Sequence, residues 1–276
     1  MKPAAFDYLR PIDLDEALEA LHEYGSDAKV LAGGQSLMPM LNMRLLNPSV
    51  IVDISELAGL GAIEETNGAI EIGAAVTQAE LGDWHALARK APLLAQALPN
   101  IGHFQTRNRG TVCGSLAHSD PSSELPLCLA TLEGEVVLRG SQGTRTVGAA
   151  AFQTAMLTTD CGPQEMVVGA RFPTVASGAG YAFAEVARRH GDFAIVALAA
   201  IVTGDTIRLG VGGVADTPQV RSWSALEGET IDDALNAFAW EMGGSEDVHA
   251  TARYRRELVR RIGRKVIEDA RDAASR

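Results

Sequence analysis

The stretch Lys29-Val30-Leu31-Ala32-Gly33-Gly34-Gln35-Ser36-Leu37 places a short apolar run, a glycine pair and two polar residues directly before a segment with helical spacing. Glycine lets the backbone approach a ligand closely and adopt dihedral angles that a side chain forbids. Backbone N–H groups at the start of a helix can bind an anion without a cationic side chain. The stretch therefore indicates a binding loop for a phosphate-bearing cofactor, although a glycine pair alone is also common in turns.

A second stretch also combines glycine with small polar residues: Arg109-Gly110-Thr111-Val112-Cys113-Gly114-Ser115-Leu116-Ala117-His118-Ser119-Asp120-Pro121. Two such stretches strengthen the prediction of a cofactor loop. The three cysteines include no C-x-x-C pair and the six histidines no H-x-x-x-H pair, which disfavours a zinc or iron–sulfur site in this chain. Any redox or transfer chemistry is therefore predicted to use an organic cofactor.

Length and composition limit the class of protein further. A chain of 276 residues is long enough for two compact domains, and 46% apolar with 21% charged residues is typical of globular proteins. The net charge of −11 disfavours nucleic acid and anionic lipid as partners. The first residues lack the apolar core of a signal peptide, and no apolar run reaches the ~20 residues that span a bilayer. We expect a cytoplasmic protein without membrane insertion.

The first ~55 residues have the pattern of a small α/β unit. Asp13 and Glu16 have the spacing of a capping box and begin a helix that Gly25 ends. Strands are predicted at residues 30–31 and 50–54, and a helix at residues 37–45. The order helix, strand, glycine loop, helix, strand predicts a small parallel sheet.

The following region, residues 58–176, has a different pattern. Asn67-Gly68 predicts a type I′ hairpin within residues 63–74, and Thr77 with Glu80 predicts a capped helix that continues to residue 87. Further helices are predicted at residues 91–98 and 123–130, and further strands at residues 135–138, 145–147 and 166–172. These elements predict a mostly antiparallel sheet with helices.

The last part of the chain follows a candidate linker at residues 177–180, Ser-Gly-Ala-Gly. Strands are predicted at residues 181–186, 193–202 and 206–211, and helices at residues 231–242 and 248–272. The final helix is rich in Arg and Glu, which predicts a solvated outer face.

A dinucleotide-binding Rossmann domain is one alternative. Gly33-Gly34 follows a strand and precedes a helix, and Asp53 ends the next strand, where that fold has its ribose-binding acid. However, no G-x-G-x-x-G sequence is present, and the middle region does not alternate strands with helices. The second glycine stretch would also have no role, so this hypothesis is the weaker one.

Four ordered stretches carry a resemblance to a known family. Residues 32–37 with Pro39 form the first, and residues 111–115, followed by 117–121 and Glu124-Leu125-Pro126, form the second. The third is Arg188-Arg189 before Asp192-Phe193-Ala194, and the fourth is Tyr254-Arg255-Arg256. Over nearly the whole chain, and in the right order, they resemble the FAD-binding medium subunits of molybdenum hydroxylases, which include carbon monoxide dehydrogenase and xanthine dehydrogenase flavoproteins.

The resemblance implies an α+β fold. A two-part FAD-binding domain would occupy residues 1–176, with a small parallel sheet in residues 1–57 and a larger antiparallel sheet with helices in residues 58–176. A C-terminal flavoprotein domain over residues 177–276 would contain a three-stranded antiparallel sheet and a helical bundle. FAD rather than NAD is the implied cofactor.

The resemblance also implies roles for individual residues. Residues 32–36 would hold the FAD pyrophosphate through backbone N–H groups, and residues 111–115 would lie beside the phosphates and the ribityl and flavin portions. Phe193 would lie near the isoalloxazine, Glu124 would be an acid near FAD, and Val167 or Val168 would approach the flavin or adenine. The implied FAD-binding residues, with no catalytic and no metal-binding residue among them, are Lys29, Val30, Leu31, Ala32, Gly33, Gly34, Gln35, Ser36, Leu37, Ile101, Thr111, Cys113, Gly114, Ser115, His118, Asp120, Glu124, Val167, Val168 and Phe193.

Some positions depart from the family pattern or leave alternatives open. Gln35 stands where close relatives often have His, and an amide can still donate a hydrogen bond. Cys113 replaces the first glycine of a pair, which requires a negative φ, and a packed inert thiol is favoured over a redox role. His118 and Asp120 could contact the flavin, or Asp120 could begin a turn. Nothing around His103 supports a covalent flavin.

The implied activity is electron transfer in an oxidoreductase complex. A molybdenum large subunit would hydroxylate the substrate, an iron–sulfur small subunit would relay the electrons, and FAD in this chain would pass them to an external acceptor. Molybdopterin and a [2Fe-2S] cluster are expected only in those partner subunits. Two alternatives stay open: a stand-alone flavin-dependent oxidoreductase, and a non-enzymatic relative that has lost FAD, to which Cys113 points.

Overall fold

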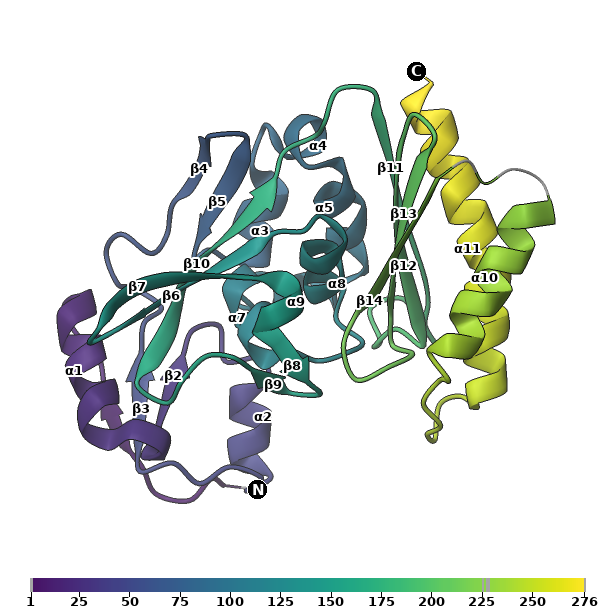
Figure 1. Cartoon of the computed structure of the whole chain (residues 1–276). Helices are drawn as coiled ribbons and strands as arrows, with labels where there is room; N and C mark the ends of the chain where they lie inside the picture. The colour runs from purple at the N-terminus through teal and green to yellow at the C-terminus, as the bar shows by residue number, and fades with distance from the viewer. Residues whose placement is uncertain (1, 225, 227–228, 276) are drawn as a thin grey trace.

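The computed structural model describes residues 2–224, 226 and 229–275, so the end residues Met1 and Arg276 of the predicted domains lie outside it. Figure 1 shows the molecule as successive layers: two sheets at the N-terminal side, a central group of short helices, a four-stranded sheet, and two long helices that cover its far face. No helix in the described residues is long and apolar enough to cross a membrane. The predicted α+β class is confirmed.

The N-terminal part contains a three-stranded parallel sheet. Its strand order is β1 (Asp7–Leu9), β3 (Val50–Asp53) and β2 (Ala28–Leu31). The connecting helices are α1 (Leu14–Tyr24), η1 (Gly25–Asp27) and α2 (Leu37–Asn42). β1 was not predicted, because its three residues are mostly exposed and too few to show an alternating pattern.

The start of α1 is stabilised much as the sequence predicts. The Asp13 side chain accepts a hydrogen bond from the Glu16 N–H at 2.9 Å. In a capping box Glu16 would accept a hydrogen bond from the Asp13 N–H. Here its Oε2 instead accepts from the N–H of the preceding residue, Ile12, at 2.7 Å. Two N–H groups before and inside the first turn are thereby satisfied.

The second part contains a five-stranded antiparallel sheet and most of the helices. The strand order is β4 (Ile63–Thr66), β5 (Ala69–Gly73), β10 (Glu165–Pro173), β6 (Glu135–Gly140) and β7 (Gly143–Gly148), with a separate pair β8 (Gln153–Ala155) and β9 (Thr158–Thr159). The helices are α3 (Gln78–Asp83), α4 (Leu87–Lys90), α5 (Pro92–Ala97), η2 (Leu98–Asn100), α6 (Phe104–Arg107), α7 (Val112–His118), α8 (Glu124–Thr131) and α9 (Ala149–Phe152).

Some local sequence signals in this part predicted the structure correctly, and others did not. Asn67 and Gly68 have φ values of 52° and 78°, both positive as the predicted type I′ turn requires. The capping box of Thr77 and Glu80 is present, but α3 ends at Asp83 because Trp84 is extended, and a separate helix α4 follows. The prediction of one helix to residue 87 was therefore wrong, and α7 was not predicted.

The C-terminal part is a four-stranded antiparallel sheet with two helices. Its strands, in order, are β11 (Ala179–Val186), β12 (Val196–Thr203), β13 (Thr206–Gly212) and β14 (Gln219–Ser224), and its helices are α10 (Glu229–Glu241) and α11 (Ala252–Ala274). The three predicted strands are present, and β14 adds a fourth at the edge. Ala179 and Gly180, predicted as linker, already belong to β11.

The central strand β12 joins the layers because its two faces pack against different elements. Ala197 and Ala199 belong to the core shared with the first two parts, whereas Val196 and Leu198 belong to the core beneath α10 and α11. Small residues on the first face let α8 come close. At Gly210 of β13 an added Cβ would lie 2.0 Å from Thr131 Oγ1 of α8. The four-stranded sheet is thus locked against the central helices.

Gly210→Ala tests this close approach. The new methyl would overlap the Thr131 hydroxyl, which is itself bonded to the Leu127 carbonyl at 2.8 Å, so we expect a loss of about 1–3 kcal/mol in the free energy of unfolding, measured by chemical denaturation. Gly148→Ala is the matched control, because Gly148 is also a strand residue, in β7, and nothing lies within 4 Å of its added Cβ. Equal stability of both variants would show that the layers tolerate a wider separation.

Candidate functional site

The two glycine stretches meet by direct backbone contact. An added Cβ on Gly33 would lie 2.1 Å from the Arg109 carbonyl oxygen and 2.7 Å from the Gly110 Cα. The first stretch leaves β2 and turns at Gly34, whose φ of 71° is in the left-handed region. Gly33 therefore has no room for a side chain, and the meeting point fixes the N-terminal part against the second part.

The second stretch is held from behind by residues 76–78, where the chain enters α3. The Gly110 carbonyl accepts from the Gln78 N–H at 2.8 Å, and the Val112 N–H donates to the Val76 carbonyl at 3.0 Å. Thr111 then caps α7, because its Oγ1 accepts from the Gly114 N–H at 3.0 Å. A stretch that looked like a glycine loop is thus a short extended segment followed by a capped helix.

A cavity of about 690 Å³ opens beside this meeting point. Its walls come from the loop before α2, from α7 and β10, and from residues 191–193 of the C-terminal part. This volume is within the usual range of about 300–1,000 Å³ for small-molecule and cofactor sites. All the predicted site residues except three line the cavity; in chain order they run from Lys29 to Phe193.

The three exceptions are Leu31, Asp120 and Val168. The Leu31 side chain lies under the loop, with Cδ1 3.0 Å from the Cβ position of Gly34. Asp120 makes the turn that was its alternative interpretation, because Oδ1 accepts from the Ser122 N–H at 2.8 Å. Val167 lines the cavity, whereas Val168 lies at a shift of register in β10 and is partly buried against the core.

Several wall residues were not predicted. Gln78 is 6% exposed, and its Oε1 is buried with no hydrogen-bond partner among the described residues. Nothing in the sequence distinguishes it from any polar residue in a first helical turn. Met40 and Cys161 also line the wall, from α2 and from the segment after β9. Asp192 lines it too, and its place directly before Phe193 in the third motif could have indicated this.

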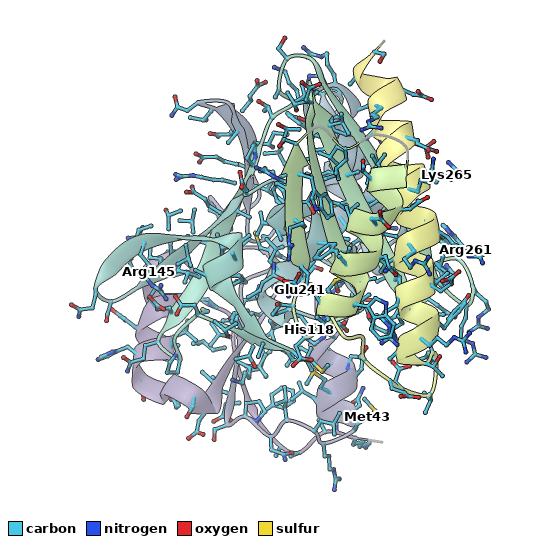
Figure 2. All side chains as sticks on the ribbon, turned by 45° about the vertical axis from the view of Figure 1, so that its right-hand side comes forward. Met43, His118, Arg145, Glu241, Arg261 and Lys265 are labelled. Atoms are coloured by element: carbon cyan, nitrogen blue, oxygen red, sulfur yellow. The ribbon has the colours of Figure 1, made fainter. Side chains whose placement is uncertain are left out.

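Two carboxyl groups on the wall have opposite electrostatic character. Burial, together with the nearby carboxylates of Glu185 and Asp120, raises the pKa of Glu124 to about 8. Arg145, labelled in Figure 2, donates to Glu165 Oε1 at 2.7 Å and to Asp160 Oδ2 at 2.6 Å. That pairing lowers the pKa of Glu165. The wall thus carries a protonated acid on one side and an ionised acid on the other.

Glu185 extends this acidic site into the C-terminal part. Burial raises its pKa to about 7, while a hydrogen bond with Glu124 acts in the opposite direction. Its Oε2 is buried and has no hydrogen-bond partner among the described residues. The two acids, from α8 and β11, therefore both hold a proton more readily than an exposed carboxyl group does.

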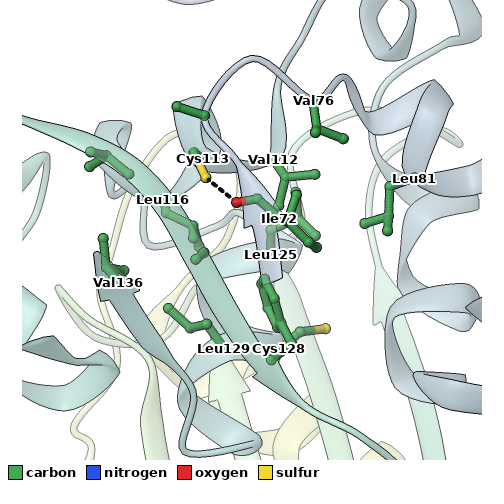
Figure 3. Close-up of a cluster of buried hydrophobic side chains, with 14 of the residues drawn as sticks. Ile72, Val76, Leu81, Val112, Cys113, Leu116, Leu125, Cys128, Leu129 and Val136 are labelled. Atoms are coloured by element: carbon green, nitrogen blue, oxygen red, sulfur yellow. Dashed lines mark hydrogen bonds between the residues drawn. The ribbon is translucent and has the colours of Figure 1, made fainter. Parts of the chain in front are cut away.

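Cys113 is a packed thiol. Figure 3 shows its sulfur directed at the Ile72 carbonyl, to which the S–H donates at 3.5 Å. It is 2% exposed and lies in α7, where its φ is not positive. Burial raises the pKa of this thiol to about 12. A low-pKa redox thiol has the opposite character, so the prediction of a packed inert cysteine fits this geometry.

The residues fit a large phosphate-bearing organic cofactor such as FAD. The cavity has sufficient volume, Gly33 and Gly110 expose backbone without side chains, and Gln78 offers a buried polar atom without a partner. His118, labelled in Figure 2, adds an imidazole from the last turn of α7. Among the described residues no group of three or more His, Cys, Asp or Glu could hold a metal ion.

Two protein families match successive parts of the chain. Residues 4–175 match the family described as FAD binding domain in molybdopterin dehydrogenase, and residues 181–270 match the CO dehydrogenase flavoprotein C-terminal domain.

Curated relatives are similar along nearly their whole length. The chain is 36% identical to the 6-hydroxypseudooxynicotine dehydrogenase complex subunit alpha of Paenarthrobacter nicotinovorans, over 98% of this chain and 96% of the relative. It is 32% identical to the carbon monoxide dehydrogenase medium chain of Hydrogenophaga pseudoflava, over 98% of both. The resemblance predicted from four ordered motifs is confirmed.

Solved structures agree with the sequence comparisons. Carbon monoxide dehydrogenase from Hydrogenophaga pseudoflava superposes with a TM-score of 0.93 at 32% identity and covers 98% of both chains. Quinoline 2-oxidoreductase from Pseudomonas putida 86 superposes with a TM-score of 0.93, also at 32% identity, over 100% of both chains.

The raised pKa of Glu124 predicts a pH-dependent stability. The folded state keeps its proton up to about pH 8, whereas the unfolded state releases it near 4.5, so the stabilisation is complete below 4.5 and is lost as pH rises to about 8. We expect the free energy of unfolding to fall on the order of 5 kcal/mol over this window, at about 1.4 kcal/mol per pKa unit, and Glu124→Gln to flatten the curve. Exposed Glu64→Gln should leave the slope unchanged. A wild-type curve that rises over this window would contradict the buried acid.

Proposed function

This chain belongs to the family of FAD-binding medium subunits of molybdenum hydroxylases, and we propose that its cavity holds one FAD for electron transfer. A molybdenum subunit would supply electrons to an iron–sulfur subunit. The FAD would take the electrons from the iron–sulfur subunit and deliver them to an external acceptor. The chain is thus one component of an oxidoreductase complex. The observation that carries the proposal is the contact of Gly33 with Arg109 and Gly110 beside the 690 Å³ cavity.

The residues around this contact have separate tasks. Backbone N–H groups of Gly33 to Ser36 would hold the phosphates. In the second stretch the N–H groups of Val112, Gly114 and Ser115 already donate within the protein, so those of Thr111 and Cys113 would supply the remaining contacts. Ile101 and Val167 would supply apolar contact, and Phe193 would stand at the flavin. When bound, FAD supplies the redox chemistry, and the protein supplies position and electrostatics.

The surroundings of the cavity favour a subunit over a stand-alone oxidoreductase. Phe193 lines the cavity and is nevertheless 72% exposed, and Phe104 of the neighbouring α6 is 63% exposed. Large aromatic side chains at the edge of a site are typical of surfaces that another protein covers. The alternative of a relative that has lost FAD loses its support, because Cys113 packs inside α7 with an ordinary helical backbone.

We place the complex in the cytoplasm. All three cysteines are free, and burial raises the pKa of each, so none is poised for disulfide exchange. Reduced buried thiols are typical of cytoplasmic proteins.

Gly33→Ala tests the binding loop. The added methyl would push the first stretch away from Arg109, so we expect the dissociation constant for FAD to rise at least about tenfold, measured by quenching of flavin fluorescence on titration. Gly61→Ala is the control, because nothing lies within 4 Å of its added Cβ. Undiminished FAD affinity of Gly33→Ala would remove the contact from the proposal.

A second experiment tests the division of labour. The purified chain should bind FAD but should not oxidise carbon monoxide, caffeine, quinoline or glyceraldehyde, the compounds in the names of its relatives. The cavity is expected to be filled by FAD, and substrate chemistry is expected in the molybdenum subunit. The measurement is a steady-state assay with an artificial electron acceptor. Turnover at enzymatic rates by the chain alone would favour a stand-alone enzyme.

A further inference from the structure

The fourth sequence motif contacts the residue that directly follows the third motif, although about sixty residues separate the two motifs. Arg255, from the motif Tyr254-Arg255-Arg256, lies in the first turns of α11 and is 3% exposed. One of its terminal nitrogens donates to the Ile195 carbonyl and, at 2.6 Å, to the Gly213 carbonyl. The other donates to Asp247 Oδ2 at 2.6 Å.

Ile195 is the closing residue of the loop that reaches the cavity. The loop leaves β11 at Val186, and the Ile195 N–H donates back to the Val186 carbonyl at 2.7 Å. Between these residues stand Gly191, Asp192 and Phe193, all three on the cavity wall. Phe193 is 72% exposed, so packing of its own side chain does not hold the loop in place.

Gly213 connects the same point to the FAD-binding part. Its N–H donates to the Pro121 carbonyl at 2.8 Å, at the end of the second glycine stretch. Its φ is 79°, and an added Cβ would lie 2.7 Å from the Ile195 carbonyl oxygen. Two backbone carbonyls therefore meet at one guanidinium, and the Pro121 segment is joined to them through the Gly213 N–H.

The position of Asp247 shows that the guanidinium is itself held in place. Asp247 Oδ1 accepts from the N–H groups of His249 and Ala250 at 2.8 and 2.9 Å, while Oδ2 accepts from Arg255. A buried charge is costly unless it is paired and hydrogen-bonded. The pairing with Asp247 leaves the other terminal nitrogen to bond the two carbonyls in one geometry, which a flexible ammonium would not reproduce.

We propose that Arg255 is a positioning residue for the cofactor cavity: by holding the Ile195 and Gly213 carbonyls together, it sets where Asp192 and Phe193 stand against the bound cofactor. This inference rests on the proposed function, since it assigns the loop to the FAD site. It gives the fourth motif, which has no atom at the cavity, a role in FAD binding.

The test compares Arg255→Met with Arg256→Met in the full chain. Arg256 is the matched control, because it is adjacent, donates to the Gly243 carbonyl and stacks on Trp240, yet contacts no part of the loop. Hydrogen exchange of the FAD-free chain is followed by mass spectrometry for peptides covering residues 187–196. FAD affinity and the visible absorption spectrum of bound flavin are measured in parallel.

We expect Arg255→Met to speed exchange in residues 187–196 at least about tenfold relative to residues 50–53, and to weaken FAD binding at least about tenfold with an altered flavin spectrum. Arg256→Met should change neither. Arg255→Lys keeps the charge but not the planar fork, so it should fall between wild type and Arg255→Met, and it serves as the test should the methionine variant not fold.

Two results would overturn the role of Arg255 while leaving the proposed function intact. One is wild-type FAD affinity and flavin spectrum in the Arg255 variants. The other is faster exchange by the same factor in every peptide, which indicates a general loss of stability. A wild-type chain that binds no FAD would instead overturn the proposed function itself.

Discussion

The structure depends on one contact between two pieces of main chain, Gly33 against Arg109 and Gly110. No Cβ fits between them, since the nearest backbone atom would be 2.1 Å away. The contact joins the parallel sheet of the first part to the helices of the second, and the cavity opens directly beside it. A side chain at this point would separate the two parts and remove one wall of the cavity. The packing and the site geometry therefore both require glycine at position 33.

Similar close approaches join the remaining layers. Gly210 lets α8 reach the four-stranded sheet, and Gly191 lets the loop after β11 touch the backbone at Gly102, where an added Cβ would lie 2.7 Å from the carbonyl oxygen. These glycines are spread over the chain and have no common sequence pattern. What they share is a position where two backbones come closer than a methyl group allows, which interiors packed at crystal-like density permit only with glycine.

Local chemistry made the fold predictable where the signal lay within a few residues. The Asn67-Gly68 turn and the Thr77–Glu80 cap both formed as expected, because each depends on backbone geometry over at most four residues. β14 was not predicted because most of its residues are polar. Gln, Arg and Ser in a half-exposed edge strand resemble the sequence of a loop. The helix α7 was hidden by its glycine and serine content, since the burial of Val112 and Leu116 that stabilises it is a tertiary effect.

The site was predictable for the opposite reason. Most of its walls lie in stretches that carry family motifs, so resemblance located them before any contact was known. Gln78, Glu185 and Cys161 carry no such signal, because their roles come from burial and from neighbours distant in sequence. Asp120 shows the limit of position alone: it stands inside a motif, yet its carboxylate is used by a turn.

A cavity whose walls belong to three layers couples ligand binding to the contacts between those layers. Three segments line the cavity, and each comes from a different part of the chain. They are the first glycine stretch, α7 together with Glu124 of α8, and the loop with Phe193. A group that contacts all three is bound only while they stay together, so its binding free energy adds to the stability of the assembled state by mass action. The buried acids Glu124 and Glu185 and the hydrogen bonds of Arg255 lie at the same junction. The polar groups that join the layers are therefore also the groups through which the cofactor would act on the fold.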